Sequence, residues 1–208
     1  MFRRYLIALV LLSLATSGQA MTLSEIQKQW AQANYQLEGD EQIEALERLK
    51  ASTEAVVVET GGQNAQLLIW DGIVKSTLAG KKGGLGALPL VKAARDSLEH
   101  ALKINPEALN GSAYTSLGAL YYQVPGWPLG FGDKEKAEKL LKSALAINPD
   151  GIDSNYFYGD FLAETKRIEA AREVLKHALQ APDRPERAIA DAGRRAEIRR
   201  RLAELDGR

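Results

Sequence analysis

Three segments of the chain repeat one pattern of small and large apolar positions. Residues 94–106, 137–149 and 171–182 each carry Ala, Leu and Ala at offsets of zero, four and seven, and each segment ends in proline. These offsets fall on one face of an α-helix, and the small alanine side chains let a neighbouring helix approach closely. Because proline cannot continue a helix, each segment is predicted to be a helix that ends just before its proline.

A glycine recurs upstream of two of these segments. Gly118 precedes Ala137 and Gly159 precedes Ala171, and both glycines lie among apolar residues. The second copy holds seven more residues between its glycine and its first alanine than the third copy. The segment 64–79 is the predicted counterpart in the first copy, although it matches less well. The pattern indicates helix pairs, each with a glycine-bearing first helix, a turn and an alanine-rich second helix.

The flanking segments are also predicted to be helical. Thr22 and Glu25 match a capping box that opens a helix, and Asp40 is predicted to cap a second helix, so residues 21–62 form a helical hairpin. Residues 183–208 contain a helix in which basic and acidic side chains are interleaved, which is typical of a solvated surface; a patch for anionic lipid or nucleic acid is the alternative. We expect this helix to cap the stack, because a terminal helix pair needs an outer face that water tolerates.

These residue types and spacings resemble the tetratricopeptide repeat (TPR) family. Its unit of about 34 residues carries an aromatic residue, a Leu-Gly pair, a Tyr, two Ala around a large apolar residue, and a Pro. Ala137 and Ala171 lie one such unit apart, and the match extends over residues 63–182. The resemblance implies an all-α fold, an α-solenoid of antiparallel helix pairs whose first helices line a concave groove that binds a peptide or a protein.

In the TPR family, residues at defined offsets from the glycine face this groove. Carried over onto the two glycine-bearing helices, the offsets select Ser112, Thr115, Ala119, Tyr122, Gln123, Asp153, Tyr156, Asp160, Ala163 and Glu164. The acidic members lie on one stripe of the third copy. The resemblance therefore implies a site for an extended partner that bears lysine, arginine or an amine. Its expected partner-binding residues are Tyr122, Asp153, Tyr156, Asp160 and Glu164, and an ordinary solvated helix face is the alternative.

Residues 124–133 form the most distinctive stretch between two predicted helices. Two prolines and three glycines favour a rigid, tightly turned loop, while Trp127 and Phe131 add large apolar area. In one interpretation, Trp127 and Phe131 are presented to a partner as a recognition loop. In the other, both side chains fold back onto the helices, and Asp133 caps the next helix.

Residues 1–20 are predicted to be a secretory signal peptide. Arg3 and Arg4 precede an uncharged apolar run at residues 5–15, and the small residues Gly18 and Ala20 follow it. This run fits the roughly 7–15 residues of a signal sequence and is shorter than the roughly 20 that span a bilayer. We therefore expect a periplasmic protein, with an uncleaved N-terminal anchor as the alternative.

Composition argues against several classes of function. The 208 residues include 27 basic and 27 acidic side chains and no cysteine, which argues against a nucleic-acid surface, disulfides and thiolate metal sites. The two histidines, His100 and His177, occur without a metal-binding or acid–base motif. No catalytic residue, metal or cofactor is therefore expected.

Two functions remain open from the sequence. The first is an exported, non-enzymatic TPR scaffold that binds a peptide or protein partner in the bacterial cell envelope. The second follows a looser resemblance to the TPR-like T-component of TRAP (tripartite ATP-independent periplasmic) transporters, carried by the signal sequence, the irregular repeats and the Gly/Pro-rich insertions. That resemblance implies an accessory protein that binds a small hydrophobic or acidic solute.

Overall fold

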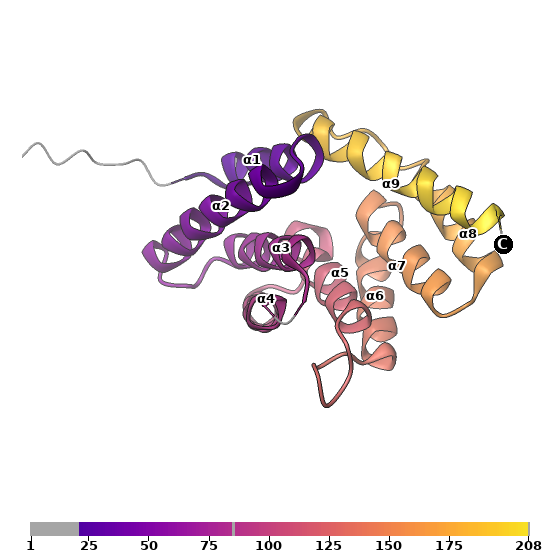
Figure 1. The fold of residues 1–208 in the computed structure, drawn as a ribbon, viewed down its shortest axis with the longest axis horizontal. Helices are drawn as coiled ribbons and strands as arrows, with labels where there is room; N and C mark the ends of the chain where they lie inside the picture. The colour runs from indigo at the N-terminus through magenta and orange to yellow at the C-terminus, as the bar shows by residue number, and fades with distance from the viewer. Residues whose placement is uncertain (1–20, 85, 208) are drawn as a thin grey trace, which may run out of the picture.

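The computed structural model describes residues 21–84 and 86–207, and within them every regular element is a helix. The predicted signal peptide lies outside the described residues. The elements in chain order are α1 (Leu23–Gln36), α2 (Gly39–Glu59), α3 (Ala65–Lys82), α4 (Ala87–Ile104), α5 (Ala108–Gln123), α6 (Lys134–Ile147), α7 (Ile152–Glu164), α8 (Ile168–Ala178), the 3₁₀ turn η1 (Pro185–Arg187) and α9 (Ala188–Asp206). The all-α prediction is confirmed, and the helices form a curved stack of pairs (Figure 1). In the described part of the chain, no helix is both long enough and apolar enough to cross a membrane.

The helix pairs pack through a contact that recurs three times. In each pair, a glycine of the first helix lies against the leucine of the Ala-Leu-Ala pattern on the second. A Cβ atom on the glycine would lie 2.6, 2.7 and 2.7 Å from the leucine Cγ atom in the pairs Gly72–Leu98, Gly118–Leu141 and Gly159–Leu175. The alanines of the pattern are fully buried. Glycine therefore recurs because a side chain at this position would overlap the partner helix.

Polar side chains begin several helices as the sequence predicts. The Thr22 hydroxyl accepts from the backbone N–H of Glu25 at 3.3 Å, and the Glu25 carboxylate accepts from that of Thr22 at 2.7 Å, which confirms the capping box. Asp133 accepts from the backbone N–H three residues later at 2.9 Å and caps α6. The predicted cap at Asp40 is wrong. Gly39, with a φ of 57°, turns the chain directly after α1, so α2 begins at Gly39 and Asp40 lies in its first turn.

The C-terminal helix α9 caps the stack and also reaches its opposite end. Ile198 and Leu205 are fully buried against α7 and α8, as expected of a capping helix. Nearer its N-terminus, α9 packs on α1, where a Cβ atom at Gly193 would lie 2.3 Å from Tyr35 Cδ1. Ala190 is buried in the apolar cluster that α1, α2 and α3 share. The helix thereby joins both ends of the stack into a closed arc (Figure 1), a contact that the sequence pattern does not predict.

We predict that Gly159→Ala lowers the free energy of unfolding by about 2 kcal/mol, because the added methyl group would overlap Leu175. Gly80→Ala is the matched control, since an added Cβ atom at this position in α3 meets no atom within 4 Å. Replacing that glycine should raise the free energy of unfolding by up to about 1 kcal/mol. Urea unfolding followed by circular dichroism measures both variants. Equal effects of the two substitutions would contradict the close-packing argument.

Candidate functional site

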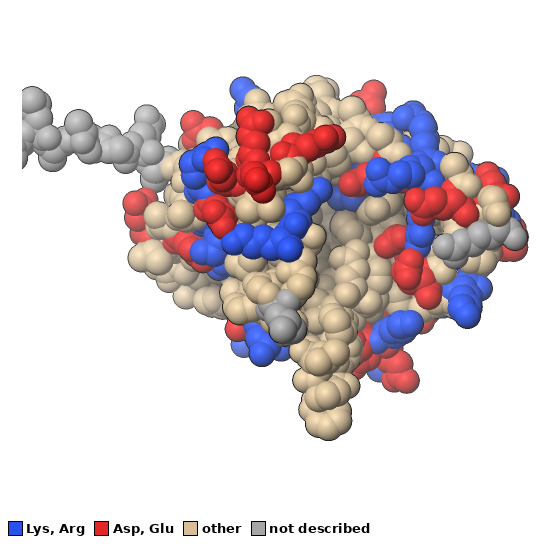
Figure 2. Space-filling model, viewed as in Figure 1, with Lys and Arg blue, Asp and Glu red and all other residues tan. Residues whose placement is uncertain are grey.

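A cavity of about 700 Å³ lies on the concave side of the stack. Its wall combines residues of α1, α3, α5 and α7, which are the first helices of the four pairs, with residues of η1 and α9. The hollow is visible on the face of the molecule shown in Figure 2. The closing helix α9 is therefore both a cap of the stack and a part of this cavity wall.

Several residues at the groove offsets lie together on this wall. From α5 and α7 they are Ser112, Thr115, Ala119, Gln123, Asp153 and Tyr156. The offsets of one, four and five after Gly72 give Ile73, Ser76 and Thr77, which also line the cavity. The two clear glycine matches, Gly118 and Gly159, do not select these three residues, whereas the weaker match at Gly72 does. Tyr122, Asp160 and Glu164 are not among the described residues that line the cavity.

Aromatic side chains of α1 and α3 form another part of the wall. The Trp30 ring lies edge-on to Tyr35 and Trp70, with ring centroids 5.7 and 5.4 Å apart. Trp30 Nε1 donates a hydrogen bond to Thr77 Oγ1 at 2.9 Å, which fixes the orientation of the ring. The sequence offered no signal for this arrangement, because it depends on how the leading hairpin packs on the first repeat.

The backbone at the start of α5 is unusual where it meets the cavity. Leu109, Asn110 and Gly111 adopt φ values of 50°, 54° and 75°. This left-handed conformation costs a residue other than glycine about 1–2 kcal/mol. The turn places Leu109 and Asn110 in the cavity wall. Strained backbone of this kind is concentrated at ligand sites, where the surrounding packing maintains it.

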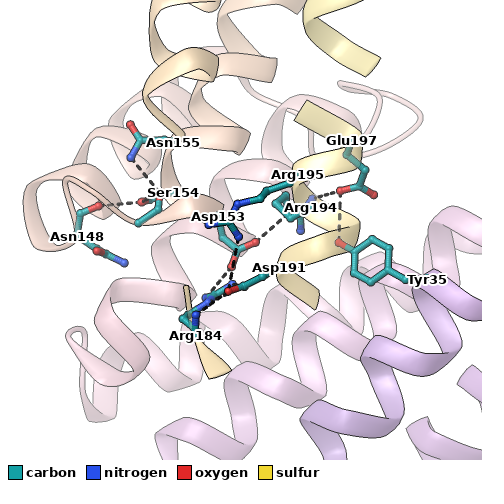
Figure 3. Close-up of polar contacts among 11 residues, drawn as sticks. Tyr35, Asn148, Asp153, Ser154, Asn155, Arg184, Asp191, Arg194, Arg195 and Glu197 are labelled. Atoms are coloured by element: carbon teal, nitrogen blue, oxygen red, sulfur yellow. Dashed lines mark hydrogen bonds and ion pairs between the residues drawn. The ribbon is translucent and has the colours of Figure 1, made fainter. Parts of the chain in front are cut away.

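Asp153 joins α7 to the C-terminal segment (Figure 3). Its carboxylate accepts from Arg184 Nη1 at 3.1 Å and from Arg194 Nε at 2.8 Å. Arg184 Nε also donates to Asp191 at 2.8 Å, and Arg194 Nη1 donates to Glu197 at 2.6 Å. Burial raises the pKa of the Asp153 carboxyl, but attraction to Arg194 and Arg184 outweighs burial and holds this pKa below its usual value. Asp153 is therefore an ionised anchor for α9.

The chain's own arginines occupy the acidic stripe that the sequence assigns to a basic partner. Arg201 of α9 pairs with both Asp160 and Glu164, and 2.8 Å separates Arg201 Nε from Asp160 Oδ1. The Tyr122 hydroxyl donates to Asp160 Oδ2 at 2.7 Å. A basic partner at these residues would have to displace Arg201, and at Asp153 two further guanidinium groups. Partner binding by this stripe stays a prediction, and it requires α9 to move.

The loop at residues 124–133 projects away from the cavity, and its two aromatic side chains behave differently. The Phe131 ring folds back onto Tyr121, with 5.3 Å between ring centroids, and the Arg95 guanidinium lies 4.8 Å from the Phe131 centroid. Trp127 is 89% exposed and Leu129 is 65% exposed. The projecting part of the loop before Asp133 is uncharged (Figures 1 and 2). The fold-back interpretation therefore describes Phe131 but not Trp127.

Comparison with known proteins connects this architecture to a family. A family model described as tetratricopeptide repeat matches residues 129–192. This segment is similar to a TPR. The matched residues contain α6, α7 and α8, the helices in which the Gly159–Leu175 contact and the acidic stripe lie. TPR domains are typically non-catalytic scaffolds that bind proteins or peptides. By this similarity, the concave cavity is a candidate binding site for a protein or peptide.

A solved structure extends the similarity beyond this TPR segment. A thermophilic TPR protein from Thermus thermophilus is 21% identical, with a TM-score of 0.53, and the match covers 86% of this chain and 98% of that chain. At this identity the similarity shows the fold alone. No curated protein matches the sequence. The TPR resemblance and the α-solenoid fold are confirmed, whereas the site residues depend on their own geometry.

We predict that Asp153→Asn lowers the free energy of unfolding by about 2 kcal/mol at neutral pH, because the amide is a weaker partner for two guanidinium groups. The folded-state pKa of Asp153 is lowered. Its contribution is therefore present above the unfolded-state pKa of about 3.9 and is lost as the pH falls through the folded-state pKa.

Urea unfolding over a pH series measures this difference, which should shrink below about pH 4. Asp183→Asn is the matched control, since the Asp183 side chain is 89% exposed in its ion pair with Arg195 and should change the free energy of unfolding by less than about 0.5 kcal/mol. A difference between wild type and Asp153→Asn that stays constant from neutral to acidic pH would contradict the pKa argument.

The two aromatic residues of the loop should differ in their contribution to stability. Phe131→Ala is expected to lower the free energy of unfolding by about 2 kcal/mol, because it removes the packing on Tyr121 and Arg95. Trp127→Ala is expected to change it by less than about 0.5 kcal/mol, because the ring is exposed. Urea unfolding distinguishes these values, and the reverse order would show that the loop packs in another way.

Proposed function

We propose that this chain is an exported, non-enzymatic scaffold of the bacterial cell envelope that holds a ligand in its central cavity. One observation carries the proposal: residues at groove offsets from three successive glycine-bearing helices line a single cavity of about 700 Å³. Concave pockets with a few convergent polar groups are the usual binding sites of proteins. Export is supported by the charged, apolar and small-residue pattern of residues 1–20.

The TPR repeat favours a peptide or protein segment as this ligand. Such a segment would lie along α5 and α7, which provide Thr115, Gln123 and Tyr156. The arginines already paired with Asp153 argue against a strongly basic segment, because each added positive charge would compete with Arg184 or Arg194. A neutral or acidic segment avoids this competition.

A second candidate is a solute-binding accessory protein, similar to the T-component of TRAP transporters. The closure of the arc by α9 favours it, since η1 and α9 contribute a wall where an open repeat array would admit a long chain. The cavity volume lies in the range of small-molecule sites, about 300–1,000 Å³. Under this candidate, a small hydrophobic or acidic solute occupies the cavity.

We predict that the chain purified from the envelope of its source organism carries a ligand that Ser116→Phe excludes. Ser116 of α5 lines the cavity, and a phenyl ring there would fill part of it. Ser52→Phe on the outer helix α2 is the matched control and should retain the ligand. Native mass spectrometry followed by denaturation identifies the released molecule, and its mass distinguishes a peptide from a solute.

The same measurement tests export, because cleavage would remove residues 1–20 from the intact mass. Equal ligand content in Ser116→Phe and Ser52→Phe would show that the cavity is not the binding site. An intact chain found only in the cytoplasmic fraction would contradict the envelope location.

A further inference from the structure

One arginine in the cavity wall differs from the others. Arg184 and Arg194 each bind two carboxylates. Among the described residues, the Arg187 guanidinium takes part in no hydrogen bond or ion pair, and its Nε atom is buried without a partner. Burial and then repulsion by Arg184 lower the pKa of Arg187. The Arg187 side chain is partly buried, so water solvates its charge incompletely, and a bound anion would offset that cost.

Trp70 lies beside this guanidinium and has an unsatisfied donor of its own. The Arg187 Cζ atom is 5.0 Å from the Trp70 ring centroid, within the range of a cation–π contact. Trp70 is 3% exposed, and its Nε1 atom has no acceptor among the described residues. The neighbouring Trp30 donates to Thr77, so an unsatisfied indole is not general in this wall. Buried donors without acceptors are rare in proteins. The free Trp70 N–H group beside Arg187 therefore indicates a place where a ligand could supply an acceptor.

We propose that Arg187 and Trp70 form an anion-binding end of the cavity, and that its ligand is a compact monocarboxylate carrying an aromatic ring. The planar guanidinium fork matches the two oxygens of a carboxylate. A single guanidinium without a carboxylate partner fits one negative charge better than two. The inference rests on the second candidate of the proposed function, since it names the class of solute that the cavity takes.

Other charges around the cavity are compatible with such a ligand. Asp153 and Glu197 also line the wall, but both carboxylates are bound to Arg194, which reduces their repulsion of an anion. Lys81 and Glu186 are exposed members of the wall, of opposite sign. The anion therefore meets its strongest unbalanced attraction at Arg187.

The rest of the wall favours a ring over a long alkyl chain. Aromatic side chains line the cavity from two sides, with Trp30 and Tyr35 on α1 and the edge-on pair Tyr156–Phe157, 5.1 Å between centroids, on α7. Rings at such distances form favourable edge and stacked contacts with a further ring. Ser112 and Thr77 add hydroxyl groups to the same wall. Such a mixed wall suits a compact ring better than a long alkyl tail.

The experiment is titration calorimetry of 3-phenylpropionate into the full mature chain, with 3-phenylpropanol as the uncharged probe of the same shape. The wild type should bind the carboxylate at least about 10-fold more tightly than the alcohol. Arg187→Gln should weaken carboxylate binding about 10-fold or more and leave the alcohol unchanged, while Arg187→Lys should recover part of the loss. Arg199→Gln, at an exposed arginine of α9 outside the cavity wall, is the matched control and should bind as the wild type does.

Trp70→Phe keeps the ring and removes the N–H group, and it should weaken carboxylate binding about 3-fold to 10-fold. Circular dichroism confirms that each variant is folded. Equal binding of the two probes, or unchanged binding in Arg187→Gln, would overturn the anion site. If Ser116→Phe still excludes the native ligand in that case, the cavity function stands and only the monocarboxylate assignment is wrong. If Ser116→Phe excludes nothing, the proposed function itself is wrong.

Discussion

The simultaneous contact of α9 with α7 and α1 is the constraint on which the cavity depends. At α7, the Asp153 carboxylate holds Arg184 before α9 and Arg194 within it. At α1, Gly193 lets the helix approach the Tyr35 ring, and the Tyr35 hydroxyl donates to Glu197 at 3.4 Å. Ion pairs fix one side of α9 and close packing fixes the other. Together they turn the concave face of a repeat array into a cavity with a lid made of the same chain.

The repeat architecture could be predicted from the sequence because its key contact is local. The glycine of each first helix meets the leucine of the next helix, as in the pair Gly159–Leu175, and both residues must recur for the pairs to stack. The closure could not be predicted in this way. Tyr35 and Glu197 are separated by 162 positions, and neither belongs to the repeated pattern.

The pairing of charged residues on α7 and α9 is a second feature that could not be predicted from the sequence. Interleaved charges on the last helix indicate a solvated surface, and acidic residues on α7 indicate a site for a basic partner. In the structure these two sets meet, since Arg201 pairs with Asp160 and Glu164. Each pattern alone indicates exposure, whereas together the charges neutralise one another across the helix interface. The unpaired Arg187 could not be distinguished from its neighbours without knowing which arginines find carboxylates.

The closed arc also has a consequence for how the chain unfolds. In a linear array, stability is a sum of unit and nearest-neighbour terms, so the terminal units can fray while the middle remains folded. Here the first helix and the last helix share an interface, and neither end of the array is free. Loss of the first hairpin removes support from α9, and loss of α9 removes support from α7. The closed arc therefore couples local opening at either terminus to the whole molecule. As a result, this repeat protein is expected to unfold as one cooperative unit.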